Sequence, residues 1–253
     1  MLNRFIFGDD PVRPPLLIVH GLFGSARNWG AIAQRMSSDR RVVTVDMRNH
    51  GESFRADSQT YADMAGDLAE VIESEGVSFD VLGHSMGGKA AMLLALRRPD
   101  LINRLVVGDI APVAYDHSNL HLVRAMHELS LNDLTSRQMA DERLRAGVPN
   151  DGTRAFLLQS LDLKSVPPHW RLNLEVLGRE MDKITGWPGA EAVCDRRALF
   201  LAGSESSYVL PEYREKIKEL FPKAILAKIP GAGHWLHADK PREFEAAVRT
   251  FLG

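Results

Sequence analysis

One serine of this sequence sits in a pattern that favours nucleophilic catalysis. Ser85 is the centre of the segment Gly-His-Ser-Met-Gly at residues 83–87, between an apolar run and a helical pattern. A nucleophile elbow requires such a tight turn from a strand into a helix, because its glycines tolerate close backbone approach and its serine hydroxyl stays exposed. The sequence therefore predicts that Ser85 attacks an acyl carbonyl.

Two other Gly-rich segments could supply the groups that such a nucleophile needs. His234 lies in residues 231–235, and its imidazole, which titrates near neutral pH, suits the transfer of the serine proton. Residues 20–25 follow an apolar run, where a loop could offer a backbone N–H to a developing oxyanion. We assign the oxyanion contacts to the backbone N–H groups of Leu22 and Met86.

The pattern of the whole chain predicts an α/β fold that would bring these segments together. Short apolar runs alternate with longer helical patterns, as in parallel strands joined by crossover helices. The runs show no polar alternation, which is typical of strands covered on both faces. We expect a mostly parallel twisted sheet with strands at 4–7, 16–19, 42–46, 79–83, 105–110, 198–203 and 226–229. Helices are predicted at 61–73, 86–98 and 241–251, the last with Asp239 as its N-cap.

One interval breaks this alternation. The stretch between residues 110 and 198 is far longer than an ordinary connection, and it contains helical patterns such as Leu120, Val123, Met126 and Leu129. We expect residues 113–193 to form a helical cap over one end of the sheet, where it would shape the acyl pocket. Residues 1–112 and 194–253 would then form the core.

Composition narrows the classes of partner. The chain has 31 Lys and Arg against 33 Asp and Glu, a net charge of −2, which gives no electrostatic signature for nucleic acid or an anionic membrane. Pairs such as Arg40-Arg41 are expected at solvated ends of elements. The one cysteine, Cys194, excludes an internal disulfide, and no apolar run is long enough to span a bilayer. We expect a cytoplasmic protein, whose oligomeric state the sequence leaves open.

Together these segments resemble the α/β-hydrolase superfamily across essentially the whole chain. More specifically, residues 20–25, 46–53, 83–89, 109–113 and 233–241 resemble the bacterial YbfF-type esterases. The resemblance implies a helical cap after strand 6 and hydrolysis of carboxylic ester or acyl thioester bonds of a small molecule through an acyl-enzyme. It implies neither a metal nor an organic cofactor.

The acid that orients the histidine has two candidates. Many members of the superfamily carry it in a G-x-x-D pattern after strand 7, where this sequence has Ser206 and, one residue earlier, Glu205. Asp109, at the end of the preceding strand, offers a second route to His234, and the resemblance to YbfF favours it.

Three alternative interpretations remain at this point. A C–C bond hydrolase or lyase would keep the same triad, whereas a ligand receptor with little turnover would not require it. His117 and His121, spaced i, i+4 beside Asp116, could hold a metal, but no H-E-x-x-H motif accompanies them. We therefore expect these two histidines on the surface or in the cap. Lys89 is expected to be solvated in the first turn of its helix.

Overall fold

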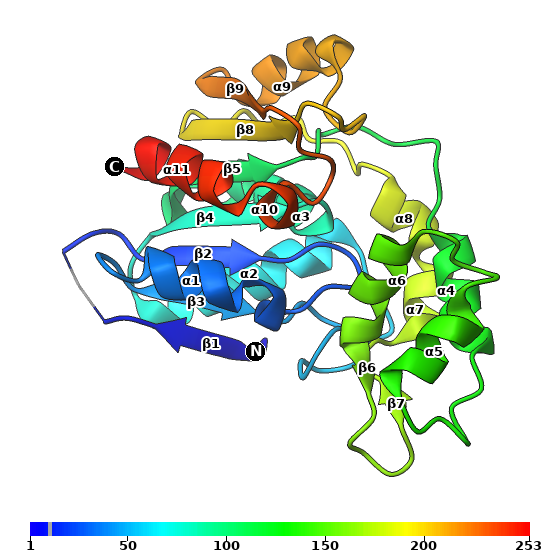
Figure 1. Cartoon of the computed structure of the whole chain (residues 1–253). Helices are drawn as coiled ribbons and strands as arrows, with labels where there is room; N and C mark the ends of the chain where they lie inside the picture. The colour runs from blue at the N-terminus through cyan, green and yellow to red at the C-terminus, as the bar shows by residue number, and fades with distance from the viewer. Residues whose placement is uncertain (10–11) are drawn as a thin grey trace.

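A seven-stranded sheet forms the centre of the protein, with helices on both of its faces (Figure 1). The computed structural model describes residues 1–9 and 12–253. The strand order is β1-β3-β2-β4-β5-β8-β9, and all neighbours are parallel except the antiparallel pair β1 and β3. The strands are β1 (Arg4–Phe7), β2 (Leu16–Val19), β3 (Val42–Val45), β4 (Phe79–His84), β5 (Ile102–Gly108), β8 (Arg197–Gly203) and β9 (Ala224–Ile229).

Alternate residues of each strand enter opposite apolar layers. Leu16 and Ile18 of β2 pack with the helices on one face, whereas Leu17 and Val19 pack with those on the other. The first face is covered by α1 (Gly30–Met36) and α11 (Pro241–Leu252), preceded by the short α10 (Leu236–Asp239). The second face is covered by α2 (Tyr61–Glu75), α3 (Met86–Arg97) and α9 (Arg214–Leu220). Both faces of the central strands are therefore buried, as their unbroken apolar sequences predicted.

The residues that lie between β5 and β8 in the sequence form a separate layer of short elements. In Figure 1 it occupies the side toward which the arrows of the parallel strands, such as β2 and β8, point. The strand that precedes this layer is β5, the fifth strand along the chain. The elements are α4 (Leu120–Glu128), α5 (Arg137–Leu144), α6 (Asp151–Leu157), β6 (Leu161–Asp162), β7 (His169–Trp170), α7 (Leu174–Arg179) and α8 (Met181–Thr185).

The end of α8 ties this layer to the core. The Tyr61 hydroxyl of α2 donates to the carbonyl oxygen of Ile184 at 2.5 Å. The Lys89 ammonium of α3 donates to the carbonyl oxygens of Thr185 at 2.9 Å and Gly186 at 2.6 Å. Lys89 is only 1% exposed, so the expectation that it is solvated is wrong. Its position on α3 directs the ammonium to carbonyls that a helix end leaves without intrahelical partners.

The start of the last helix also differs from the prediction. Helix α11 begins at Pro241 and Lys240 is its N-cap, whereas Asp239 ends α10. The Asp239 carboxylate instead accepts a hydrogen bond from the backbone N–H of Gly233 at 2.9 Å. Asp239 therefore fixes the residue that precedes His234 rather than a helix terminus.

Candidate active site

The candidate catalytic residues all lie just beyond the carboxyl ends of parallel strands. Ser85 follows β4, Asp109 follows β5, and Leu22 lies in the loop after β2. His234 lies in the loop between β9 and α10. Ligand sites of open α/β sheets form at this edge, because loops from several strands converge there.

The turn at Ser85 is backbone-strained and depends on its two glycines. Ser85 has φ 53° and ψ −121°, a combination that costs a non-glycine residue about 1–3 kcal/mol. A Cβ atom at Gly83 would collide with the carbonyl of Gly87, and one at Gly87 would collide with the carbonyl of His20. The hydrogen bond from the Ser85 N–H to the Gly108 carbonyl, at 2.9 Å, helps to hold the turn. The strain presents the Ser85 hydroxyl at the start of α3.

A chain of hydrogen bonds connects Ser85, His234 and Asp109. The Nε2 atom of His234 lies 3.0 Å from Ser85 Oγ, and its Nδ1 atom lies 2.7 Å from Asp109 Oδ2. The Asp109 side chain is fully buried, and its Oδ1 atom accepts a hydrogen bond from the Gly203 N–H at 2.9 Å. Because the carboxylate can only accept, Nδ1 carries the imidazole proton and Nε2 is free to accept the serine proton.

The alternative acid does not take part in this chain. Glu205 is exposed, and no hydrogen bond or ion pair joins its carboxylate to His234 within the described residues. Ser206, which fills the position after β8 where many members of the superfamily carry the acid, donates its hydroxyl hydrogen to Asp109 Oδ2. The loop after β8, through Ser206, and the loop after β9, through His234, therefore both contact the Asp109 carboxylate.

The backbone N–H groups of Leu22 and Met86, near Ser85, have no hydrogen-bond acceptor within the described part of the chain. Ser85 and Leu22 line a cavity of about 250 Å³, together with His234 and apolar side chains such as Trp29 and Phe156. An oxyanion that formed on a substrate carbonyl bound at Ser85 could accept from such unpaired donors.

Two buried histidines brace the loop that carries Leu22. His20 Nε2 accepts from the Met47 N–H at 2.9 Å, and His50 Nε2 accepts from the Phe23 N–H at 3.2 Å. Burial lowers the pKa of His20 and lowers the pKa of His50 to about 3. Both rings are therefore neutral near pH 7, which leaves Nε2 able to accept. His20 therefore supports this loop as a neutral hydrogen-bond acceptor.

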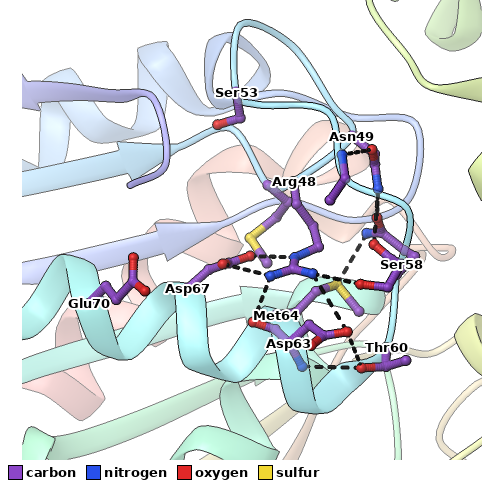
Figure 2. Close-up of polar contacts among 12 residues, drawn as sticks. Arg48, Asn49, Ser53, Ser58, Thr60, Asp63, Met64, Asp67 and Glu70 are labelled. Atoms are coloured by element: carbon purple, nitrogen blue, oxygen red, sulfur yellow. Dashed lines mark hydrogen bonds and ion pairs between the residues drawn. The ribbon is translucent and has the colours of Figure 1, made fainter.

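An arginine network fixes the loop that contains His50 (Figure 2). The Arg48 guanidinium donates to both carboxylate oxygens of Asp67 at 2.6 and 2.8 Å and to the Ser58 hydroxyl at 2.9 Å. Figure 2 shows Arg48 lying over α2, which carries both Asp67 and Asp63. The Arg48 guanidinium is 3.5 Å from the Asp63 carboxylate. Bidentate pairs of this kind restrict both position and orientation. The loop is therefore held against α2 independently of any substrate.

Sequence reasoning missed a residue that positions His234. The Nε2 atom of His84, next to Ser85 in the chain, lies 2.8 Å from the His234 carbonyl oxygen and must donate to it. His84 is buried, and burial lowers its pKa well below the usual value. The sequence shows that His84 lies within the 83–87 motif, but its partner, the His234 carbonyl, lies 150 residues away in the chain. No local pattern signals such a contact.

The remaining candidates lie outside this arrangement. His117 precedes α4 and contacts the Tyr208 hydroxyl at 2.8 Å, whereas His121 is on α4 itself. No group of three or more His, Cys, Asp or Glu side chains that could hold a metal occurs within residues 1–9 and 12–253. Cys194 is buried, and burial raises its pKa.

Comparison with known proteins places the chain in a family. The model of the alpha/beta hydrolase family matches residues 16–247. The chain belongs to the alpha/beta hydrolase family. This hydrolase is 41% identical to the sn-1-specific diacylglycerol lipase ABHD11 of Mus musculus, over 99% of this chain and 85% of the relative. It is 40% identical to the esterase YbfF of Escherichia coli (strain K12), over 94% of this chain and 92% of the relative.

A solved structure gives the same result for the fold of this hydrolase. A marine microorganism esterase superimposes with a TM-score of 0.94 at 36% identity, over 99% of this chain and 98% of the other. The predicted fold class and the predicted enzyme class, a serine hydrolase of carboxylic esters, are confirmed. None of the helices in the described part of the chain is long and apolar enough to cross a membrane.

Proposed function

We propose that Ser85, His234 and Asp109 are the catalytic triad of this hydrolase. The observation that carries the proposal is the chain of two hydrogen bonds, of 3.0 and 2.7 Å, from Ser85 Oγ through the imidazole to Asp109. The three groups have the mutual geometry that a nucleophile, its base and an orienting acid require. We retain Asp109 rather than Glu205 as the acid, because of these two carboxylates it is Asp109 that contacts the His234 imidazole.

In the first half of the reaction, Ser85 Oγ forms a bond to the substrate carbonyl carbon while His234 Nε2 takes the hydroxyl proton. The carbonyl oxygen becomes an oxyanion, which accepts hydrogen bonds from the N–H groups of Leu22 and Met86. The intermediate then breaks its bond to the leaving oxygen, and His234 gives that oxygen the proton. An acyl-enzyme on Ser85 and a free alcohol result.

In the second half, water repeats these steps. His234 Nε2 takes a proton from the water as it attacks the acyl carbonyl, and the new tetrahedral intermediate uses the same two backbone donors. Its collapse breaks the bond to Ser85 Oγ, which regains its proton from His234. The carboxylic acid leaves, and the enzyme returns to its first state without any cofactor.

We further propose that residues 113–193 act as a cap that selects substrates, since Leu122 and Phe156 from this segment line the cavity at Ser85. Hydrolysis of acyl thioesters would use the same steps with a thiol as the leaving group, and activity on acyl-coenzyme A compounds tests it. The cytoplasmic location stays a prediction, which fractionation of cell extracts can test.

Replacement of the nucleophile tests the proposed triad. Ser85→Ala should lower ester hydrolysis at least about a thousandfold, because only binding and the oxyanion contacts would remain. A fluorophosphonate should label the wild type once per chain and should not label this variant. Ser207→Ala is the matched control, because Ser207 is an exposed serine of the loop after β8. Fluorophosphonate labelling of Ser85→Ala, or a full hydrolytic rate in that variant, would rule the triad out.

A further inference from the structure

Two cavities meet at Ser85, and they differ greatly in size. One has a volume of about 250 Å³ and the other about 30 Å³. Four residues line both of them, namely Leu22, Ser85, Asn119 and Tyr208. A substrate whose carbonyl lies at Ser85 can therefore send its two arms into different cavities.

Tyr208 separates the two cavities beside the catalytic imidazole. Its ring stacks on the His234 ring with 3.9 Å between centroids and 21° between planes. The Tyr208 carbonyl accepts from the Tyr115 hydroxyl at 2.6 Å, and its own hydroxyl contacts His117 Nε2 at 2.8 Å. Tyr208 is thus fixed at three points. His234 lines the large cavity and not the small one.

The position of His234 decides which arm of the ester enters which cavity. His234 Nε2 must give a proton to the leaving oxygen, so that oxygen lies within hydrogen-bond reach of Nε2. The alcohol attached to it therefore departs on the side of His234, into the large cavity. The acyl group points away from the imidazole, toward the cavity that His234 does not line.

We propose that the small cavity is the acyl subsite and the large cavity is the alcohol subsite. The preferred substrates are then short-chain acyl esters of bulky apolar alcohols. This inference rests on the proposed triad and adds a substrate class to it. The segment 113–193, which we expected to shape the acyl pocket, contributes to both cavities: Leu122 and Phe156 line the large one, and Ile184 and Thr185 line the small one.

The walls of the small cavity make it rigid as well as small. Its volume is about two to three times the roughly 10–15 Å³ that a cavity needs to hold one water molecule, which suits an acetyl or propionyl chain. Ile110 and Ile184, both at most 5% exposed, form apolar walls. Lys89 forms another wall, and its ammonium lies 4.6 Å from the centre of the Tyr115 ring. A long acyl chain would have to displace these packed groups.

An isomeric pair of esters tests the assignment. Octyl acetate has a short acyl group and a long alcohol, whereas ethyl octanoate has the reverse, with the same atoms and an alkoxide leaving group in both. We expect kcat/KM for octyl acetate to exceed that for ethyl octanoate by about tenfold or more, because a close-fitting pocket discriminates at least this strongly against added methylenes. A ratio near one, or a preference for ethyl octanoate, would overturn the assignment.

Matched substitutions in the two cavities give a second measurement. Ile184→Ala enlarges only the small cavity and should raise kcat/KM for ethyl octanoate several-fold, while its carbonyl contact with Tyr61 is retained. Leu122→Ala enlarges only the large cavity and should raise KM for octyl acetate without improving ethyl octanoate. The opposite pattern would refute the inference. If Ile184→Ala fails to fold, Ile110→Val removes a single methyl group from the same wall.

The two levels of the proposal can fail separately. Hydrolysis that persists in Ser85→Ala, or no Ser85-dependent hydrolysis of either ester, counts against the triad itself. Rates that depend on Ser85 but favour ethyl octanoate leave the triad in place and overturn only the assignment of the two cavities.

Discussion

An isosteric change at Asp109 gives the sharpest test of how His234 is held in its reactive form. The buried carboxylate accepts hydrogen bonds from His234 Nδ1, the Ser206 hydroxyl and the Gly203 N–H. Asp109→Asn keeps the shape of the side chain but replaces one acceptor oxygen by an NH₂ donor. We expect the variant to fold and to lose most of its turnover at neutral pH.

The contacts around Asp109 fix the direction and the size of this effect. If the Asn NH₂ faced Gly203, two donors would oppose each other in a buried place, at a cost of about 1–3 kcal/mol. If it faces His234 instead, the Ser206 hydroxyl can rotate and Nδ1 can accept. The imidazole proton then moves to Nε2, which can no longer take the proton of Ser85. The wrong tautomer lowers kcat by as much as ~10⁴ in a serine protease, or about 5.5 kcal/mol.

The assay compares Asp109→Asn with Glu205→Gln, which makes the same chemical change at the exposed alternative acid. We expect Glu205→Gln to alter kcat/KM for p-nitrophenyl acetate by only a few-fold. Melting temperatures exclude unfolding, and the nitrogen chemical shifts of His234 report its tautomer. If Asp109→Asn keeps more than about a tenth of the activity, the tautomer reasoning is wrong. If Glu205→Gln is the crippled variant, the acid lies in the loop after β8.

Two further predictions concern a buried amine and metal dependence. Burial lowers the pKa of Lys89 from 10.5 to about 7, so between these values the unfolded chain holds a proton that the folded chain has lost, and the free energy of unfolding rises with pH. In urea denaturation, the free energy of unfolding of Lys89→Met should rise less between pH 7 and pH 9 than that of the wild type, by up to about 2 kcal/mol. An equal rise in the variant and the wild type would contradict this. Exhaustive chelation should leave ester hydrolysis unchanged, because Ser85 and His234 need no metal for the proposed steps. Loss of activity that zinc restores would disprove this and would direct attention to His117 and His121.

The sequence was most informative where chemistry constrains the backbone. Gly83 and Gly87 are needed because the turn at Ser85 brings their Cα atoms against other backbone segments, so the requirement is visible as a residue type at fixed spacing. The apolar runs predicted the strands for a similar reason, since helices bury both faces of the central strands. The strand before Asp109 illustrates the limit. It runs from Ile102 to Gly108, not over 105–110, because Asp109 turns away from the sheet with φ 48°.

Buried charges were the least predictable feature, because their partners are distant in sequence. Arg40, in a pair expected to be solvated, is 1% exposed and donates to Asp80 at 2.8 Å. Lys89 was misjudged for the same reason, since the carbonyls that receive its hydrogen bonds come from Thr185 and Gly186. A charged residue in a helix is ordinarily exposed, and only tertiary structure reveals a partner that makes its burial tolerable.

The histidines show why residue type alone does not identify a catalytic base. His20 and His84 line the cavity at Ser85, and His50 packs against His20, but burial lowers the pKa of each, and backbone groups occupy their Nε2 atoms. They are neutral supports for the loops around the site. His234 differs in having a carboxylate at Nδ1 and the serine hydroxyl at Nε2. A base must lose and regain a proton in each cycle, which requires a partner that stabilises the imidazolium and an open path to the leaving group. Only the arrangement around His234 offers both.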